Sequence, residues 1–240
     1  MKPAWIDYVN ELRQRLLLWL AVTIILFCVF VYGANALYKF IAIPLLDLLP
    51  STQNLIATNV ITPLFTPLKL AWLSALLVSL PFLFYQLWRF IAPALYHSEK
   101  RWLWPLISLS VLLFYGGIGF AYWIVLPLVF KFITHFVPHY VALMPDMNQY
   151  LNFVTQLLLA FGVVFQVPVV IIALTLTGMV SLAAVKKQRR YVVVGAFIIG
   201  MLLTPPDVVS QILLAIPIWL LFEIGIVLAT WLLLSFKKPY

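Results

Sequence analysis

The sequence predicts an all-α integral membrane protein with six transmembrane helices, and its composition is the first reason. Of the 240 residues, 65% are hydrophobic and only 9% are charged, and the mean hydropathy is +1.10. A soluble domain carries about 25% charged residues, so this chain has too few to cover a water-facing surface. Soluble enzymes and nucleic-acid-binding modules are therefore excluded. We assign the net charge of +8 to cytoplasmic loops and anionic lipid head groups.

Four apolar runs reach the length of about 20 residues that a spanning helix needs. The first covers residues 16–38; it is too long for the apolar region of a signal peptide and no small-residue cleavage site follows it, so we interpret it as a retained helix. The second and third cover residues 68–90 and 102–130. The fourth covers residues 150–180 and contains Pro168, which predicts a kink.

Two shorter apolar segments follow, at 191–204 and 208–223. Thr204, Pro205, Pro206 and Asp207 form a strong turn signal between them. One interpretation is a single long helix broken at the two prolines, and the other is a tight hairpin of two short spans. We favour the hairpin because a helix does not continue through two prolines and an aspartate caps a new helix start. Residues 1–240 then form a single transmembrane domain whose last two spans are short.

The distribution of lysine and arginine predicts the orientation of the spans. Six spans place both termini on one side of the membrane, and that side receives twelve of the basic residues. The other side receives only Lys39, Lys69 and Lys131. Because basic residues accumulate on the cytoplasmic side, both termini are expected in the cytoplasm. The outside segments, residues 39–67 and 131–149, are rich in proline and are expected to form ordered caps with short interfacial helices.

Two cytoplasmic carboxylates are the strongest candidates for recognition. Glu11 lies at the entry to the first helix, and Glu99 lies in the loop after the second. One interpretation is that each pairs with a neighbouring Arg or Lys on a solvated face. The other is that they form an acidic receptor for a cationic peptide, because carboxylates are the natural bidentate partners of guanidinium groups.

Polar residues at membrane depth form a second group of candidates. Gln166 lies in the middle of the fourth span, where a buried amide either makes a packing hydrogen bond or faces a wet cavity. Glu223, near the cytoplasmic end of the last span, is expected to snorkel to the interface. The chain has no glycine-rich phosphate loop, zinc motif or nucleophile elbow, and we interpret His135 and His139 as surface-loop residues. No metal or cofactor is therefore expected.

The short fifth and sixth spans indicate a docking site for other helices, as the length of the fifth shows. About thirteen apolar residues reach only about 20 Å, against a hydrocarbon core of about 30 Å. We expect single-span partner helices to cover this gap, with Met201, Thr204 and Gln211 forming the contact near the outer turn. The alternative is that Thr204 bonds its own backbone and Gln211 caps the turn.

Several motifs, in their order and spacing, resemble the TatC family, the multi-spanning subunit of the bacterial twin-arginine protein translocase. They are ELRQRL at 11–16, FTPLK at 65–69, YQLWRFIAPALY at 85–96, FG at 161–162, QVP at 166–168, LTPPD at 203–207 and LFE at 221–223. The resemblance covers nearly the whole chain. It departs in two places: Tyr8 and Val9 stand where many members have His-Leu, and Gln166 stands where some members have Glu.

The resemblance implies a cup-shaped six-helix bundle in the bacterial cytoplasmic membrane, without enzyme activity. It implies a receptor for signal peptides that bear two consecutive arginines, on cargo already folded, with transport driven by the proton-motive force. The single-span TatA and TatB subunits are the implied partners, together with membrane lipid and further copies in a larger complex. The residues implied for signal-peptide binding are Glu11, Glu99, Arg13, Phe90 and Leu95.

Two other classes of membrane protein compete with this interpretation. A secondary transporter would use Lys69, Gln166 and Asp207 along its path, but its repeats would leave an internal symmetry that the sequence does not show. An intramembrane aspartyl protease needs two aspartates at one depth, and Asp207 has no second aspartate at its level within the spans. Translocation is therefore favoured over both.

The orientation gives a first testable prediction. Reporter tags at Met1, near Ser98, near Lys187 and at Tyr240 should all report the cytoplasm. Tags near Thr52, Asp146 and Asp207 should report the outside. A cytoplasmic signal from Asp207 would contradict the hairpin and, with it, the count of six spans.

Overall fold

The computed structural model describes residues 4–46, 56, 62–91, 103–136, 145–203 and 208–236. These residues are helical apart from short turns and one isolated bridge between Ile56 and Asp146. The chain divides into two compact units. The first contains Met1–Pro93 with Val137–Thr155, and the second contains Ala94–Phe136 with Gln156–Tyr240. The single transmembrane domain stays a prediction.

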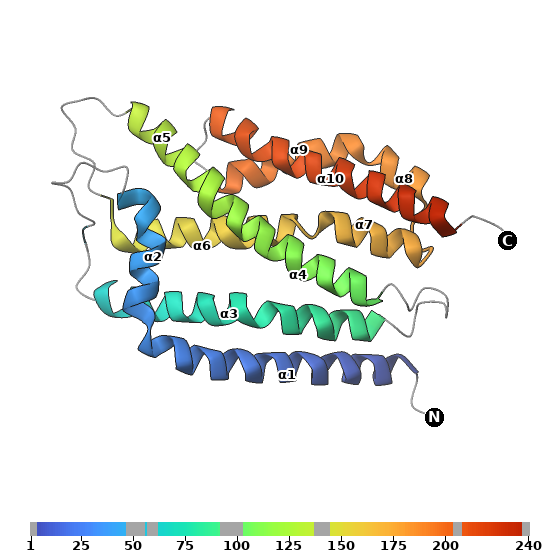
Figure 1. Cartoon of the computed structure of the whole chain (residues 1–240), viewed down its shortest axis with the longest axis horizontal. Helices are drawn as coiled ribbons and strands as arrows, with labels where there is room; N and C mark the ends of the chain where they lie inside the picture. Colours follow the sequence, from blue (N-terminus) through green and yellow to red (C-terminus); the bar gives the residue numbers. More distant parts are fainter. Residues whose placement is uncertain are drawn as a thin grey trace. The chain divides into compact units, whose positions relative to one another are not determined.

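The first unit is built on two long helices that pack side by side. They are α1 (Ala4–Tyr32) and α3 (Thr62–Ile91), and α2 (Ala34–Leu46) turns away from α1 and also contacts α3 (Figure 1). The start of α6 (Met147–Val164) completes the unit. The buried Tyr150 hydroxyl on α6 donates to the Ile41 carbonyl oxygen on α2 at 2.7 Å. This hydrogen bond ties α2 to α6.

The expected first span, residues 16–38, is wrong at its outer end, because α1 stops at Tyr32. Gly33 is a turn residue, and its carbonyl oxygen already accepts from the amides of Ala36 and Leu37. Glycine is among the weakest helix formers, so the chain changes direction there and begins α2. That helix overlaps the outside segment that was expected to carry an interfacial helix.

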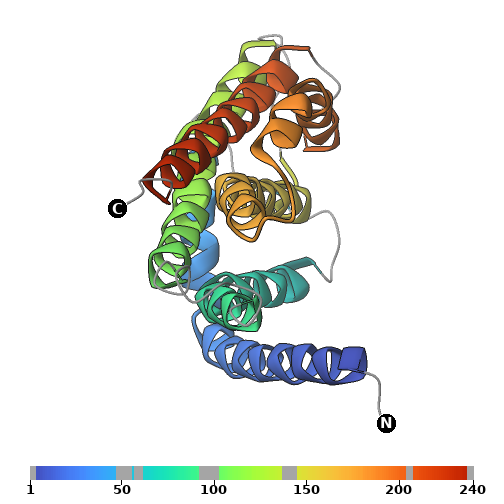
Figure 2. The same ribbon diagram turned by 90° about the vertical axis from the view of Figure 1, so that its right-hand side faces the viewer.

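The second unit contains the remaining helices. α4 (Leu103–Phe120) continues through a π-helical segment, η3 (Ala121–Val125), into α5 (Leu126–Phe136). The later part of α6 leads to α7 (Val167–Leu176), the short α8 (Leu182–Lys187), α9 (Arg189–Leu203) and α10 (Val208–Phe236). α10 packs along both α7 and α9, and Figure 2 shows the three helices from a second side.

Proline residues shape two of the helices of the second unit. The Leu126 amide bonds to the carbonyl oxygen of Ala121, five residues back, immediately before Pro127. A proline ring clashes with the carbonyl four residues earlier, and widening the helix by one residue relieves this clash. Pro168 occupies the first turn of α7 directly after the break between α6 and α7, so the kink predicted in the fourth span is confirmed.

The last two helices differ in length, which corrects the prediction that both are short. α9 has only 15 residues, about 22 Å of helix. α10 has 29 residues and continues past Glu223 to Phe236, so the expected segment 208–223 was cut off too early. Arg189 pairs with Glu223 at 2.7 Å, so the carboxylate is neutralised inside the helix and does not end it. Residues 204–207, including the predicted Asp207 cap, lie outside the described ranges.

Five helical stretches of the described chain are long and apolar enough to cross a membrane: Tyr8–Tyr32, Thr62–Phe90, Trp104–Phe132, Met147–Leu176 and Gln211–Leu233. α9 is too short to belong to this set. The fold is thus an all-α membrane protein, as predicted. The count of six spans and the cytoplasmic placement of both termini stay predictions.

Glycines let α4 and α6 approach closely in the second unit. A Cβ atom added at Gly117 would lie 2.7 Å from the Phe161 carbonyl oxygen, and one added at Gly162 would lie 2.5 Å from the Phe114 ring. Phe114 and Phe161 are each only 1% exposed. Gly117 on α4 therefore packs against Phe161 on α6, and Gly162 on α6 packs against Phe114 on α4. Small residues permit such close packing between helices in membranes.

A pair of neighbouring glycines provides a matched test of this packing. We predict that Gly117→Ala lowers the stability of the folded chain by about 1–3 kcal/mol, because its Cβ meets backbone that cannot move aside. Gly116→Ala is the control, since a Cβ added there meets nothing within 4 Å. Thermal unfolding of both variants in detergent measures the difference. Equal melting temperatures would contradict the close packing.

Candidate functional site

A seam of paired side chains joins α1 and α3 along their length. The pairs step in opposite directions along the two helices, so the helices are antiparallel: Arg15 with Gln86, Trp19 and Thr23 with Ser79, and Phe27 with Trp72. Ser79 is central to the seam. Its hydroxyl accepts from Trp19 Nε1 at 3.0 Å and lies 2.9 Å from the Thr23 hydroxyl. Polar groups buried in an apolar setting are costly when unpaired, so these bonds fix the register of the two helices.

The seam ends at Arg15, whose guanidinium holds Glu11 and Gln86 together. Its Nη2 and Nε atoms donate to Glu11 Oε1 at 2.6 and 3.1 Å, and its Nη1 donates to Gln86 Oε1 at 3.1 Å. Gln86 is buried and the Arg15 side chain is only 17% exposed. Glu11 and Arg15 are four residues apart on one helix, the spacing at which side chains meet. The predicted pairing of Glu11 with a neighbouring basic residue is therefore confirmed.

Glu11 keeps an acceptor available after this pairing. Both hydrogen bonds from Arg15 use Oε1, and no residue in the described ranges bonds to Oε2. The Glu11 side chain is 40% exposed, more than twice the value for Arg15. Arg15 thus holds the carboxylate through Oε1, and among the described residues Oε2 stays available to a further donor.

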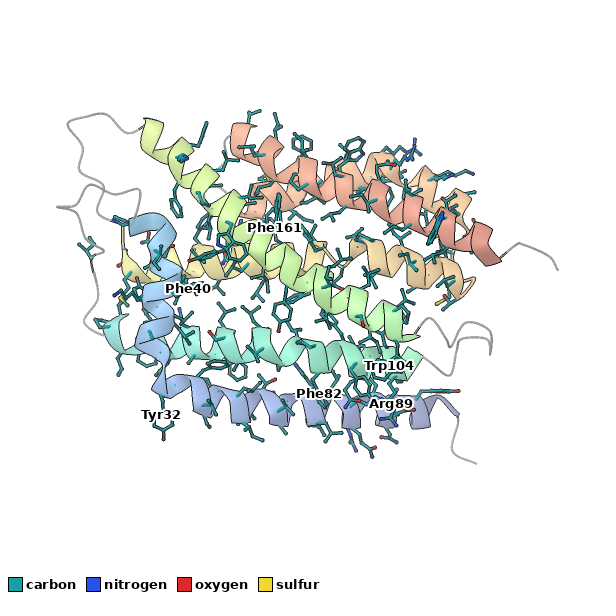
Figure 3. All side chains as sticks on the ribbon, viewed as in Figure 1. Tyr32, Phe40, Phe82, Arg89, Trp104 and Phe161 are labelled. Carbon is teal, nitrogen blue, oxygen red and sulfur yellow. The ribbon has the colours of Figure 1, made fainter. Side chains whose placement is uncertain are left out.

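Two other predicted recognition residues, Arg13 and Phe90, lie near the same ends of α1 and α3. Arg13 is exposed, and Phe90 is half-buried near the end of α3. Arg89, labelled in Figure 3 at that end of α3, is exposed and lies 3.4 Å from the Tyr85 hydroxyl. Leu95 and Glu99 lie outside the described residues. The structure therefore describes Glu11, Arg13 and Phe90 but not the whole predicted set.

Gln166 makes a packing hydrogen bond, one of its two predicted roles. Its Nε2 atom donates to the Ser110 carbonyl oxygen on α4 at 2.9 Å, and the side chain is half-buried. Gln166 occupies the break between α6 and α7. An amide in this position ties the interrupted helix to its neighbour α4.

The end of α9 and the start of α10 approach each other closely. A Cβ added at Gly200 would lie 3.3 Å from the Gln211 carbonyl oxygen. Gln211 provides this contact and is half-buried, and Met201, which follows Gly200, is 53% exposed. Thr204, Pro205, Pro206 and Asp207 belong to the part of the chain that is not described.

Comparison with known proteins decides the family. The family model "Sec-independent protein translocase protein (TatC)" matches residues 7–217. The chain is 50% identical over 224 residues to the TatC protein of Haemophilus influenzae, covering 93% of this chain and 88% of the relative. It is 49% identical over 221 residues to that of Escherichia coli K12, covering 92% and 86%.

The chain belongs to the TatC family. A solved structure described as "Twin Arginine Translocase Receptor- TatC" matches with a TM-score of 0.83 and 37% identity, over 93% of this chain and 98% of the other. The protein is thus a multi-pass membrane component of a protein translocase, and not an enzyme. The family resemblance in the sequence is confirmed.

Sequence reasoning missed the residues that support the site in this TatC chain. Gln86 and Ser79 come from α3 and contact α1 across a separation of more than 50 residues, which no local pattern reveals. At the other end of the first unit, Lys69 bonds to the amide oxygens of Asn148 and Asn152 at 3.2 and 3.3 Å. The sequence placed Lys69 outside or on a transport path but gave no sign of these partners.

Tyr38 is a further group that the sequence did not single out. Burial first, and the Asp146 carboxylate second, raise the pKa of its hydroxyl to about 12. The hydroxyl oxygen is buried without a hydrogen-bond partner among the described residues. Asp146 itself accepts from the amides of Asn148 and Gln149 at 3.0 and 2.9 Å and so caps the start of α6. Tyr38 therefore stays protonated and neutral beside the cap.

Proposed function

We propose that this TatC-family chain is a receptor for twin-arginine signal peptides in a translocase that exports folded proteins across the cytoplasmic membrane, driven by the proton-motive force. The observation that carries the proposal is the Glu11 carboxylate. Arg15 holds it through one oxygen, and the other accepts no hydrogen bond from the described residues. A guanidinium of the signal peptide would take the second oxygen.

The energy of such a contact fits a receptor that must also release its ligand. A hydrogen bond to a charged group contributes about 1.5–3 kcal/mol, and partial exposure of Glu11 avoids the cost of burying an unpaired charge. Glu99 is proposed to receive the second arginine. Arg13 is proposed to flank the site, and Phe90 and Leu95 to contact the apolar part of the signal.

The single-span partner subunits TatA and TatB are proposed to dock along α9 and α10. α9 covers only about 22 Å, so a neighbouring helix would complete the hydrophobic layer beside its 15 residues. Met201 is exposed, and the backbone of Gln211 lies against Gly200, so both sit where the two helices meet. Met201, Thr204 and Gln211 are the proposed contact, and further copies of the chain are expected in the assembled complex.

We predict that Glu11→Gln and Glu99→Gln each weaken binding of a fluorescent twin-arginine signal peptide by about 10- to 100-fold, the equivalent of one charge-assisted contact. Glu99→Gln should have the larger effect, because Glu11 already shares its charge with Arg15. Fluorescence anisotropy on the purified chain measures both affinities.

Glu223→Gln is the charge-matched control for this experiment. Its carboxylate is paired with Arg189 in the second unit, so its removal should leave peptide affinity at the wild-type value. Wild-type affinity in both the Glu11 and the Glu99 variants would contradict an ionic receptor.

The docking proposal predicts disulfide crosslinks from α9 and α10 to a partner helix. Met201→Cys and Gln211→Cys should each crosslink efficiently to a cysteine in a single-span subunit. The background should carry Cys28→Ser, because the native thiol is exposed. Val29→Cys on α1 and Leu112→Cys on α4 are exposed control positions in the first and third spans. Crosslinks at these control positions, with none at 201 or 211, would exclude the proposed surface.

A further inference from the structure

An apolar groove runs between α9 and α10 in the second unit. It has a volume of about 160 Å³ and is lined by Val193, Ala196, Phe197, Ala215, Ile216 and Trp219. The two alanines are 1% and 5% exposed and form its floor. The four larger side chains are 37–49% exposed and form its rim. The groove therefore opens on the outer face of the helix pair.

Positive charge lies at one end of this groove. Arg190, Val193 and Phe197 are spaced at i, i+3 and i+7 on α9, so the arginine shares a helix face with two lining residues. On α10, Ile216, Trp219 and Glu223 have the same spacing. Glu223 bonds to Arg189 at 2.7 Å, so an ion pair joins the two helices just beyond the apolar lining.

This end of the groove carries more basic side chains than carboxylates that pair with them. Lys186, Lys187, Arg189 and Arg190 lie within five residues, and all four are exposed. Within the described parts of the chain, Glu223 is the carboxylate that pairs with this group, and it bonds to Arg189. The Arg190 guanidinium lies 4.9 Å from the centre of the Tyr191 ring. Three cations therefore remain for an external anion.

We propose that the groove binds one acyl chain of an anionic phospholipid whose phosphate head group is held by Arg190, Lys186 and Lys187. Basic pockets between transmembrane helices recognise such head groups, and the apolar lining begins one helical turn from Arg190. The rise from Arg190 to Phe197 is about 10 Å, so head group and upper acyl chain follow a single face of α9. This site is independent of the proposed peptide receptor, which lies in the first unit.

The dimensions of the groove favour an acyl chain over other occupants. Sites for drug-sized ligands enclose about 300–1,000 Å³, well above the volume found here. A transmembrane helix is about 10 Å wide and would lie over the rim without filling the space above Ala196 and Ala215. A single hydrocarbon chain is narrow enough to enter between the exposed rim side chains.

The fluorescence of Trp219, on the rim of the groove, reports whether a lipid chain is in contact with it. The purified full chain is reconstituted in phosphatidylcholine vesicles that contain 10% phosphatidylglycerol. In one sample the phosphatidylglycerol carries brominated acyl chains, and in the other an equal 10% of the lipid is brominated phosphatidylcholine. Bromine quenches tryptophan fluorescence on contact. Subtracting the quenching of Trp219→Phe from that of the wild type isolates the contribution of Trp219. We expect this contribution to be several-fold larger with brominated phosphatidylglycerol than with brominated phosphatidylcholine at equal concentration.

Two variants test the two halves of the site. Arg190→Gln should lower the preference for phosphatidylglycerol about 5-fold, which corresponds to the value of about 1 kcal/mol for one basic residue at an anionic surface. Lys39→Gln removes the same charge from the exposed Lys39 in the first unit and should leave the preference unchanged. Val193→Phe fills the groove from its rim and should reduce quenching of Trp219 by the anionic lipid.

Two results would overturn the proposal. Equal quenching of Trp219 by the two brominated lipids would mean that the groove is an ordinary lipid-facing depression. Quenching by both lipids that is lost when a single-span subunit is added would mean that the helix proposed to dock near Met201 and Gln211 also covers the groove. In both cases the affinity for twin-arginine peptide is measured on the same samples, and normal affinity would leave the peptide receptor proposal standing.

Discussion

The guanidinium of Arg15 is the group on which the candidate site depends. It lies on the face of α1 that contacts α3, where the long apolar part of α1 begins, and its side chain is only 17% exposed. A cation in this setting must keep its donors bonded, and Glu11 and Gln86 supply the acceptors. Below it, Ser79 joins Trp19 and Thr23. The requirement to satisfy buried polar groups therefore fixes the register of α1 against α3, and with it the position of the Glu11 carboxylate.

The same requirement explains the polar groups of the second unit. Gln166, at the break between α6 and α7, bonds to the Ser110 carbonyl oxygen on α4. Glu223 stays within α10 because Arg189 reaches it from α9. Apolar packing then depends on shape: Gly117 and Gly162 allow helix approaches that any side chain would block. Polar bonds set the register, and glycines set the distances.

The sequence predicted the fold class and the kink at Pro168, and one of its two interpretations of Glu11 was pairing with a neighbouring basic residue, because each depends on local composition or on spacing within one helix. It did not predict the break at Gly33 or the full length of α10. Both errors arose because the sequence was interpreted without the contacts between helices. The single glycine at position 33 is a weak signal for a helix end within an apolar run. Glu223 was taken as a helix end because its partner Arg189 lies 34 residues away in the sequence. Gln86 and Ser79 were missed for the same reason. Contacts between helices depend on how the helices pack, and a single sequence does not reveal that packing.

The most direct test of this account is the affinity of a twin-arginine signal peptide for the variant Gln86→Met. Methionine preserves the length and approximate volume of glutamine but accepts no bond from Arg15 Nη1. If Arg15 positions Glu11, the affinity falls several-fold, while the chain stays folded and loses only the cost of one unpaired buried donor, about 1–3 kcal/mol. An unchanged affinity in this variant would show that Glu11 needs no support from α3, and would contradict the account.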